Sequence, residues 1–290
     1  MDDARRRSLN RTRLERPEEV AKAASRRVRR PLVRDGRQLL IIAADHTARG
    51  MIDISPNDAA MSNRYDLLQR LLTALDVPGV DGVLATPDIV EDLLLLGALN
   101  DMVVFGSMNR GGHASTAFEM DDRFTAYSPE AIARAYLDGG KMLVRIDADD
   151  PMSVRTLEAC ANAVTELATH GLVALLEPFI AHRVAGHVRN DLSTEAVMKS
   201  IAIAAALGAT SAYTWLKIPV VEDMDRVVEA ATMPLMLLGG QRSDNPDVLF
   251  TKWEKALRLP GVVGLVVGRN LLYPPDDDVE AAVAAAASLL

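Results

Sequence analysis

Short apolar runs alternate along the chain with longer segments whose apolar positions recur at helical spacing. The apolar runs occupy residues 39–44, 82–85, 102–105, 142–146, 172–176, 211–216, 234–238 and 262–267. Between most of them lies an amphipathic stretch, of which residues 151–170 and 194–207 are examples. Such stretches are typical of helices, and strands separated by helices in this rhythm indicate parallel βαβ units.

Eight such units in roughly 250 residues predict an α/β fold of the closed (β/α)8 barrel type. A doubly wound open sheet is the alternative fold that the same pattern allows. We expect the barrel to span residues 36–290, with the alanine-rich segment 280–290 as its last helix. Residues 1–35 precede the first predicted strand and form a separate, basic N-terminal helical arm.

Charge is unevenly divided between the arm and the barrel. The chain has a net charge of -8, which argues against nucleic acid as a bulk partner. Residues 1–37 hold thirteen Arg or Lys against six Asp or Glu, a net +7, which leaves -15 for the remainder. A basic arm can bind polyanions or a membrane, but it more often packs on its own acidic body or on a sister subunit, and we expect one of these two packing arrangements.

Several classes of protein are disfavoured by composition. Cys160 is the only cysteine, so neither a disulfide framework nor a cysteine-based metal site is expected. The chain begins without an apolar leader and contains no run of about 18 apolar residues. We therefore expect a soluble, cytoplasmic protein without a membrane partner, and a homo-oligomer, since barrels of this type commonly associate.

A barrel places its chemistry where strands end at the carboxyl rim. The polar and glycine residues in or after the predicted strands are Asp45, His46, Lys141, Arg145, Glu177, Lys217, Gly239, Gly240, Gly268 and Arg269. Glu177 and Lys217 follow neighbouring strands, and alternate residues of a strand share a face. If both point into the barrel mouth, the two side chains can meet there.

Lys217 stands among large apolar residues in the segment Thr-Trp-Leu-Lys-Ile-Pro, residues 214–219. Burial and a nearby like charge, supplied by Lys141 or Arg145, would lower its pKa. The free amine is then a nucleophile toward carbonyl groups and forms a Schiff base. A neighbouring carboxylate can transfer the protons, so the site predicts class I aldolase chemistry without a metal or other cofactor.

Glycine turns follow the seventh and eighth predicted strands. Gly239, Gly240 and Gly268 would let backbone N–H groups approach an anion closely, and Arg269 would add a charged hydrogen bond. In a barrel these two loops are the usual phosphate-binding region. A phosphorylated small molecule is therefore the expected substrate and partner.

The order and spacing of the strand ends resemble the class I aldolase superfamily from about residue 36 to the C-terminus. The segments that carry this resemblance are IIAADHTARG (41–50), KMLVRIDADD (141–150), LLEPF (175–179), WLKIP (215–219), LMLLGGQRSD (235–244) and GLVVGRNLL (264–272). The superfamily includes deoxyribose-phosphate aldolase, tagatose-bisphosphate and sulfofructose-phosphate aldolases, and archaeal-type fructose-bisphosphate aldolase.

The resemblance implies a Schiff-base role for Lys217 and proton transfer by Glu177, and it matches Asp45 and Lys141 to further active-site positions. It implies phosphate binding by the turns that contain Gly239, Gly240, Gly268 and Arg269. Tagatose-type enzymes have Asp-Gln-Arg after the first strand, whereas this chain has Asp-His-Thr-Ala-Arg, so His46 and Arg49 receive no role. Arg145 stands where the family often has an aromatic residue.

The chain is most similar to an actinobacterial-type subgroup of aldolases often associated with inositol breakdown. That similarity implies 5-dehydro-2-deoxygluconate 6-phosphate as substrate, with dihydroxyacetone phosphate and malonate semialdehyde as products.

Two other functions stay open at this point. One is a metal-dependent lyase or isomerase that uses Asp45, His46 and Glu177, and the other is a sugar-phosphate sensor without catalysis. His182 and His187, beside Arg183 and Arg189, are candidates to meet a substrate carboxylate or an acidic surface.

Overall fold

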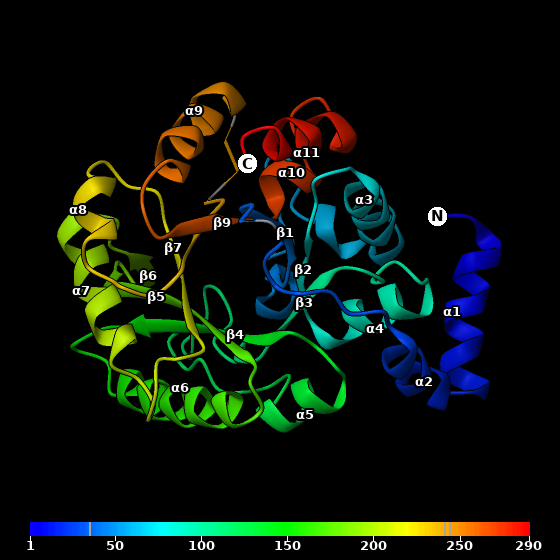
Figure 1. Cartoon of the computed structure of the whole chain (residues 1–290), viewed down its shortest axis with the longest axis horizontal. Coiled ribbons are helices and arrows are strands. Elements are labelled where there is room, and N and C mark those ends of the chain that lie inside the picture. Colours follow the sequence, from blue (N-terminus) through cyan, green and yellow to red (C-terminus); the bar gives the residue numbers. More distant parts are fainter. Residues whose placement is uncertain (35, 241, 244) are drawn as a thin grey trace.

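A closed ring of parallel strands forms the body of the protein (Figure 1). The computed structural model describes residues 1–34, 36–240, 242–243 and 245–290, so Asp35 of the predicted arm, and Gln241 and Asp244 of the LMLLGGQRSD segment, lie outside them. The ring strands are β1 (Leu39–Ala44), β2 (Gly82–Ala85), β3 (Val103–Ser107), β4 (Gly139–Ile146), β5 (Val173–Val184), β7 (Thr214–Ile218), β8 (Leu235–Leu238) and β9 (Val262–Val267). Each pairs in parallel with its neighbour, and pairing of β4 with β5 closes the ring. The predicted (β/α)8 barrel is confirmed, and the open sheet is wrong.

Helices connect successive strands and cover the outside of the ring. They are α3 (Arg64–Asp76), α4 (Pro87–Leu95), α5 (Pro129–Arg134), α6 (Met152–Thr169), α7 (Thr194–Ala205), α8 (Met224–Val228), α9 (Pro246–Leu257), α10 (Arg269–Leu272) and α11 (Val279–Ala287), with short 3-10 helices η1 (His46–Arg49) and η2 (Ala60–Ser62). Side chains satisfy the free N–H groups at several helix starts. Ser193, for example, accepts a hydrogen bond from the backbone N–H of Ala196 at the start of α7.

One strand is longer than its apolar run indicated. β5 continues past Glu177 to Val184 and pairs antiparallel with β6 (His187–Asn190), which the pattern did not predict. The outer part of this hairpin is polar and exposed, so it lacks the buried apolar signal by which strands are recognised in sequence. His182 and His187 lie on this exposed hairpin beyond the barrel rim.

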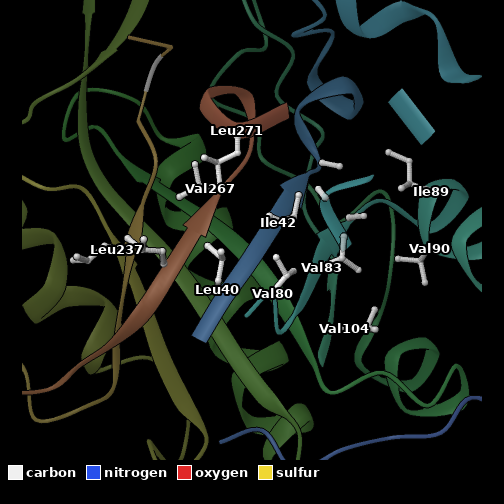
Figure 2. Close-up of a cluster of buried hydrophobic side chains, with 14 of the residues drawn as sticks. Leu40, Ile42, Val80, Val83, Ile89, Val90, Val104, Leu237, Val267 and Leu271 are labelled. Carbon is white, nitrogen blue, oxygen red and sulfur yellow. The ribbon is translucent and has the colours of Figure 1, made fainter. Parts of the chain in front are cut away.

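Alternation along the strands separates two apolar cores. In β1, Leu39, Ile41 and Ala43 belong to the core inside the ring, whereas Leu40 and Ile42 pack toward the surrounding helices. Figure 2 shows the outer core between strands and helices. The inner core fills the part of the barrel interior nearer the strand starts. Inward-facing residues further along the strands therefore meet at the carboxyl end of the barrel.

The basic N-terminal segment packs on the acidic body of its own chain. Its helices are α1 (Asp3–Glu15) and α2 (Glu18–Arg26), and α2 packs beside α4 (Figure 1). Arg13 pairs with Asp92 of α4 at 2.5 Å. The expectation of packing against the protein's own acidic surface is confirmed by these contacts.

After α2, the segment runs across the amino end of the barrel. Arg27 and Arg29 pair with Asp138 at 3.1 and 2.9 Å, and Arg30 pairs with Asp81 at 2.6 Å. Asp81 directly precedes β2 and Asp138 directly precedes β4, and each also accepts a hydrogen bond from a backbone N–H of a neighbouring strand. Leu32 packs against the inner apolar core. Arginine positive charge thus stabilises the end of the barrel opposite the predicted site.

We predict that Arg27→Ala lowers the free energy of unfolding by about 3 kcal/mol, because it removes one partner of a buried ion pair. Arg27 also donates to the carbonyl oxygens of Met102 and Tyr136, which would lose that donor. Denaturant titration measures the change. Arg7→Ala, an exposed arginine of α1, is the matched control and is expected to stay within about 0.5 kcal/mol of wild type. An equal loss in both variants would contradict a specific role for the buried pair.

Candidate active site

Lys217 lies on the inward face of β7 at the carboxyl end of the barrel. Leu216 and Ile218 pack outward, while Trp215 packs against the inner core, so strand alternation turns Lys217 into the mouth. Its side chain is almost fully buried. The Nζ atom donates a hydrogen bond of 2.8 Å to Oε1 of Glu177 on the neighbouring strand β5. The predicted meeting of these two side chains is confirmed.

Glu177 lies between two lysines. Its Oε1 accepts from Lys217, and its other oxygen, Oε2, forms an ion pair with Lys141 of β4. Lys141 is fully buried and also lies 3.4 Å from Oδ2 of Asp45, which follows β1. The four predicted residues therefore form one continuous chain, Lys217–Glu177–Lys141–Asp45, in which lysine amino groups and carboxyl groups alternate.

Arg110 completes this chain, although it was not among the site residues predicted from the sequence. Its guanidinium forms an ion pair with Oδ2 of Asp45 and donates a 3.2 Å hydrogen bond to Oγ of Ser107. Ser107 Oγ in turn donates to Asp45 at 3.2 Å. Its position in the sequence could have indicated this role, because Arg110 follows the end of β3 at the same rim as the other charged residues.

The surroundings lower the pKa of Lys217. Burial is the largest cause, and the charges of Arg110 and Arg269 add to it. Glu177 opposes the change, since its carboxylate favours the ammonium form. The nearby like charges expected from Lys141 or Arg145 are thus provided chiefly by Arg110 and Arg269 instead. The net effect favours a free amine, which is the nucleophilic form.

Lys141 and Glu177 are shifted more strongly. Burial, reinforced by Arg110, holds the pKa of Lys141 well below its usual range. Burial would raise the pKa of Glu177, but Lys141 and Lys217 outweigh it and hold the value well below the usual range. Glu177 is therefore ionised and accepts hydrogen bonds from both amines, so it can act as a base.

Arg145 lies apart from this chain. Its guanidinium makes a bidentate contact with Asp122 at 2.8 and 2.7 Å and donates to the carbonyl of Glu119. Arg49 donates to the carbonyl of Gly112 at 2.8 Å. Through these contacts, both arginines hold the long segment between β3 and α5 against the carboxyl end of the barrel. Arg145 was predicted to be among the catalytic residues, but its contacts are with this segment. Nothing in the local sequence around Glu119 and Asp122 indicates that these acidic residues fold back onto β4.

The glycine turns lie side by side, because β8 pairs with β9. Gly240 has φ of 71°, a left-handed conformation that glycine adopts without strain. A Cβ on Gly268 would lie 2.7 Å from Cε1 of His46, so a side chain there would collide with the imidazole. Arg269 follows this turn and is half-buried, and its Nε atom is buried without a hydrogen-bond partner among the described residues. These features are suited to binding an anion between the two turns.

The charged chain is a poor set of metal ligands. Within the described parts of the chain, no group of three or more His, Cys, Asp or Glu side chains is arranged to hold a metal ion. Asp45 and Glu177, two of the ligands that a metal-dependent reaction would need, already pair with Arg110 and the two lysines.

Across the described parts of the chain, each helix is too short or too polar to cross a membrane.

Comparisons with known proteins agree with the barrel. A sequence model of the family described as Cgl0159-like matches residues 37–287. The crystal structure of Cgl0159 from Corynebacterium glutamicum is 52% identical, with a TM-score of 0.97, and the match covers 100% of this chain and 97% of that one. A search of curated proteins finds no match.

More distant solved structures share the fold. A Schiff-base-forming fructose-1,6-bisphosphate aldolase is 21% identical, with a TM-score of 0.68, over 93% of this chain and 99% of that one. An archaeal fructose-1,6-bisphosphate aldolase, whose catalytic lysine is covalently bound to the carbinolamine intermediate of its substrate, is 19% identical, with a TM-score of 0.68, over 93% and 98%. At these identities the likeness concerns the barrel architecture.

Proposed function

The chain belongs to the Cgl0159-like family, and we propose that it is a class I aldolase that cleaves a phosphorylated ketose or keto acid through a Schiff base on Lys217. The observation that carries this proposal is the hydrogen bond of 2.8 Å between the buried Lys217 amine and Glu177, at the carboxyl end of the barrel. A lysine with a lowered pKa, held beside a carboxylate, is the arrangement that imine formation requires.

The first steps form the Schiff base. The free amine of Lys217 adds to the substrate carbonyl carbon and gives a carbinolamine. Glu177, hydrogen-bonded to the amine, takes a proton from nitrogen and passes it to the hydroxyl group of the carbinolamine, which departs as water. The resulting imine takes up a proton from solvent and becomes the iminium ion. Lys141 stabilises the charge on Glu177 during this exchange through their ion pair.

Cleavage follows from the iminium ion. Asp45 or Glu177 removes the proton of the hydroxyl group beyond the bond to be broken. The carbon–carbon bonding electrons move toward the iminium nitrogen and leave an enamine on Lys217, while the other fragment departs as an aldehyde. Protonation of the enamine carbon and addition of water then release the ketone product and restore the amine.

The phosphate group is proposed to bind at the turns of Gly239, Gly240, Gly268 and Arg269. Binding energy from a phosphate remote from the reacting carbon would hold the carbonyl near Lys217. The proposed products are dihydroxyacetone phosphate, or a similar small carbonyl compound, and an aldehyde. Within this class, 5-dehydro-2-deoxygluconate 6-phosphate is the substrate we propose, on the similarity to the aldolase subgroup associated with inositol breakdown.

Borohydride trapping tests the proposal. The protein is incubated with dihydroxyacetone phosphate in EDTA, reduced, and mapped by mass spectrometry. We expect a reduced adduct on Lys217, formed equally well with and without EDTA because no step uses a metal. The fully buried Lys141 is an internal comparison, since its amine faces Asp45 and Glu177. An adduct on Lys141, no adduct, or trapping that EDTA abolishes would reject the mechanism.

A further inference from the structure

His46 occupies a position that the proposed steps leave unused. It follows Asp45 and begins the 3-10 helix η1. Its Cε1 atom lies against Gly268, where an added Cβ would come within 2.7 Å. Because Cε1 is bonded to both ring nitrogens, the edge of the imidazole that carries its hydrogen-bonding atoms faces the turn between β9 and α10. An added Cβ would also collide with the Ala43 carbonyl oxygen, so glycine at 268 accommodates both this strand end and the ring.

Neither His46 nor Arg269 is satisfied at this turn. The Nδ1 atom of His46 and the Nε atom of Arg269 are both buried, and neither has a hydrogen-bond partner among the described residues. Buried polar atoms of folded proteins nearly always have a partner, because leaving one unpaired costs about 1–3 kcal/mol. One unsatisfied nitrogen belongs to a ring in contact with Gly268 and the other to the residue after that glycine, whose charge acts on the ring. We read the pair as the donors of a site for a ligand that accepts hydrogen bonds.

The local charge favours an anion. The charged side chains that act on His46 are the cations Arg269, Lys217 and Lys141, with Glu177 as the opposing carboxylate. Asp53 and Glu177 are the carboxylates that act on Arg269. At the imidazole itself, three cations are opposed by one carboxylate, and that carboxylate is paired with both lysines. Burial, with Arg269 and Lys217, holds the pKa of His46 well below its usual range, so the free ring is neutral and offers one N–H donor.

We propose that His46 joins the phosphate site already assigned to Arg269 and the glycine turns, and that His46 makes the site select phosphorylated over unphosphorylated ketones. This inference rests on the proposed aldolase function for the identity of the substrate. The imidazole N–H and the guanidinium Nε–H would each donate to a phosphate oxygen, with the glycine turn leaving space for the group. A role for His46 in proton transfer at the reacting carbon is the competing explanation, and it predicts a different pattern of loss.

The test compares two ketones and one bare anion. Half-saturation of borohydride trapping on Lys217 is measured with dihydroxyacetone phosphate and with dihydroxyacetone, and inorganic phosphate binding is measured by calorimetry. For His46→Ala we expect half-saturation to rise about 10- to 50-fold for dihydroxyacetone phosphate, with a matching loss of inorganic phosphate affinity. Half-saturation for dihydroxyacetone should not change. His46→Gln, which restores an N–H donor, should recover part of the lost affinity.

His170→Ala is the matched control, because His170 is exposed and ends α6 at the opposite end of the barrel. It should leave all three values at wild type. Equal losses for both ketones in His46→Ala would overturn the proposal and favour proton transfer or a folding defect, as would unchanged binding of inorganic phosphate. If wild-type protein traps neither ketone, the aldolase function fails, but the phosphate titration still decides whether His46 and Arg269 form an anion site.

Discussion

Lys217→Met is expected to abolish Schiff-base trapping and to lower kcat/KM for carbon–carbon cleavage by about 10⁴-fold or more, because it removes the nucleophile itself. Methionine keeps most of the length and apolar volume of the lysine side chain, so the packing around β7 should persist. Glu177 retains its ion pair with Lys141 in this variant and is not left as an unpaired buried charge. The expected result is an inactive protein with a wild-type circular dichroism spectrum.

The variant is assayed by substrate cleavage, by borohydride trapping and by thermal unfolding. Lys199→Met, an exposed lysine of α7, is the matched control and should keep full activity. Turnover by folded Lys217→Met above about 1% of wild type would mean that another group forms the covalent intermediate, or that none is formed. Loss of activity together with unfolding would be a failure of the fold, which the spectrum and thermal transition would report.

Glu177→Gln is expected to reduce kcat by about 10²- to 10⁴-fold while preserving the shape of the side chain. Glutamine cannot take up the proton that, in the proposed mechanism, moves from the amine to the carbinolamine hydroxyl. It also removes the carboxylate that both buried lysines contact. Trapping on Lys217 should therefore become slow rather than disappear, which distinguishes this variant from Lys217→Met.

The pH dependence of trapping gives a second readout for Glu177→Gln. The Glu177 carboxylate raises the pKa of Lys217, so its removal should lower that pKa further. Since the free amine is the reactive form, the acidic limb of the trapping-rate profile should move to lower pH. Glu158→Gln, an exposed glutamate of α6, should leave rate and profile unchanged. A profile that stays in place or moves to higher pH would contradict the assigned contact between Glu177 and Lys217.

The chain's local pattern was sufficient to predict the barrel and much of its site. Period-two alternation places Asp45, Glu177 and Lys217 on inward faces at strand ends, and closure of parallel strands brings strand ends to one rim. Their convergence follows from geometry that any such barrel shares. The basic character of residues 1–37 likewise predicted packing on the acidic body, since unlike charges attract over distances longer than a single contact.

Tertiary structure alone decided which charged groups pair. Arg110 and Arg145 both lie at the same rim, yet one contacts Asp45 and the other contacts Asp122. The difference depends on how the segment between β3 and α5 folds back, which local propensity does not specify. The β5–β6 hairpin was missed for a related reason, because its exposed outer residues have no apolar alternation.

The amino-acid sequence by itself thus determined the architecture and the inward-facing candidates, because periodicity and strand order are properties of consecutive residues. The pairing of Lys217 and Lys141 through Glu177, and the unsatisfied nitrogens of His46 and Arg269 beside Gly268, were decided by tertiary structure. These features depend on side-chain distances and burial between strands far apart in the chain, and hydrogen bonding and pKa respond to those quantities.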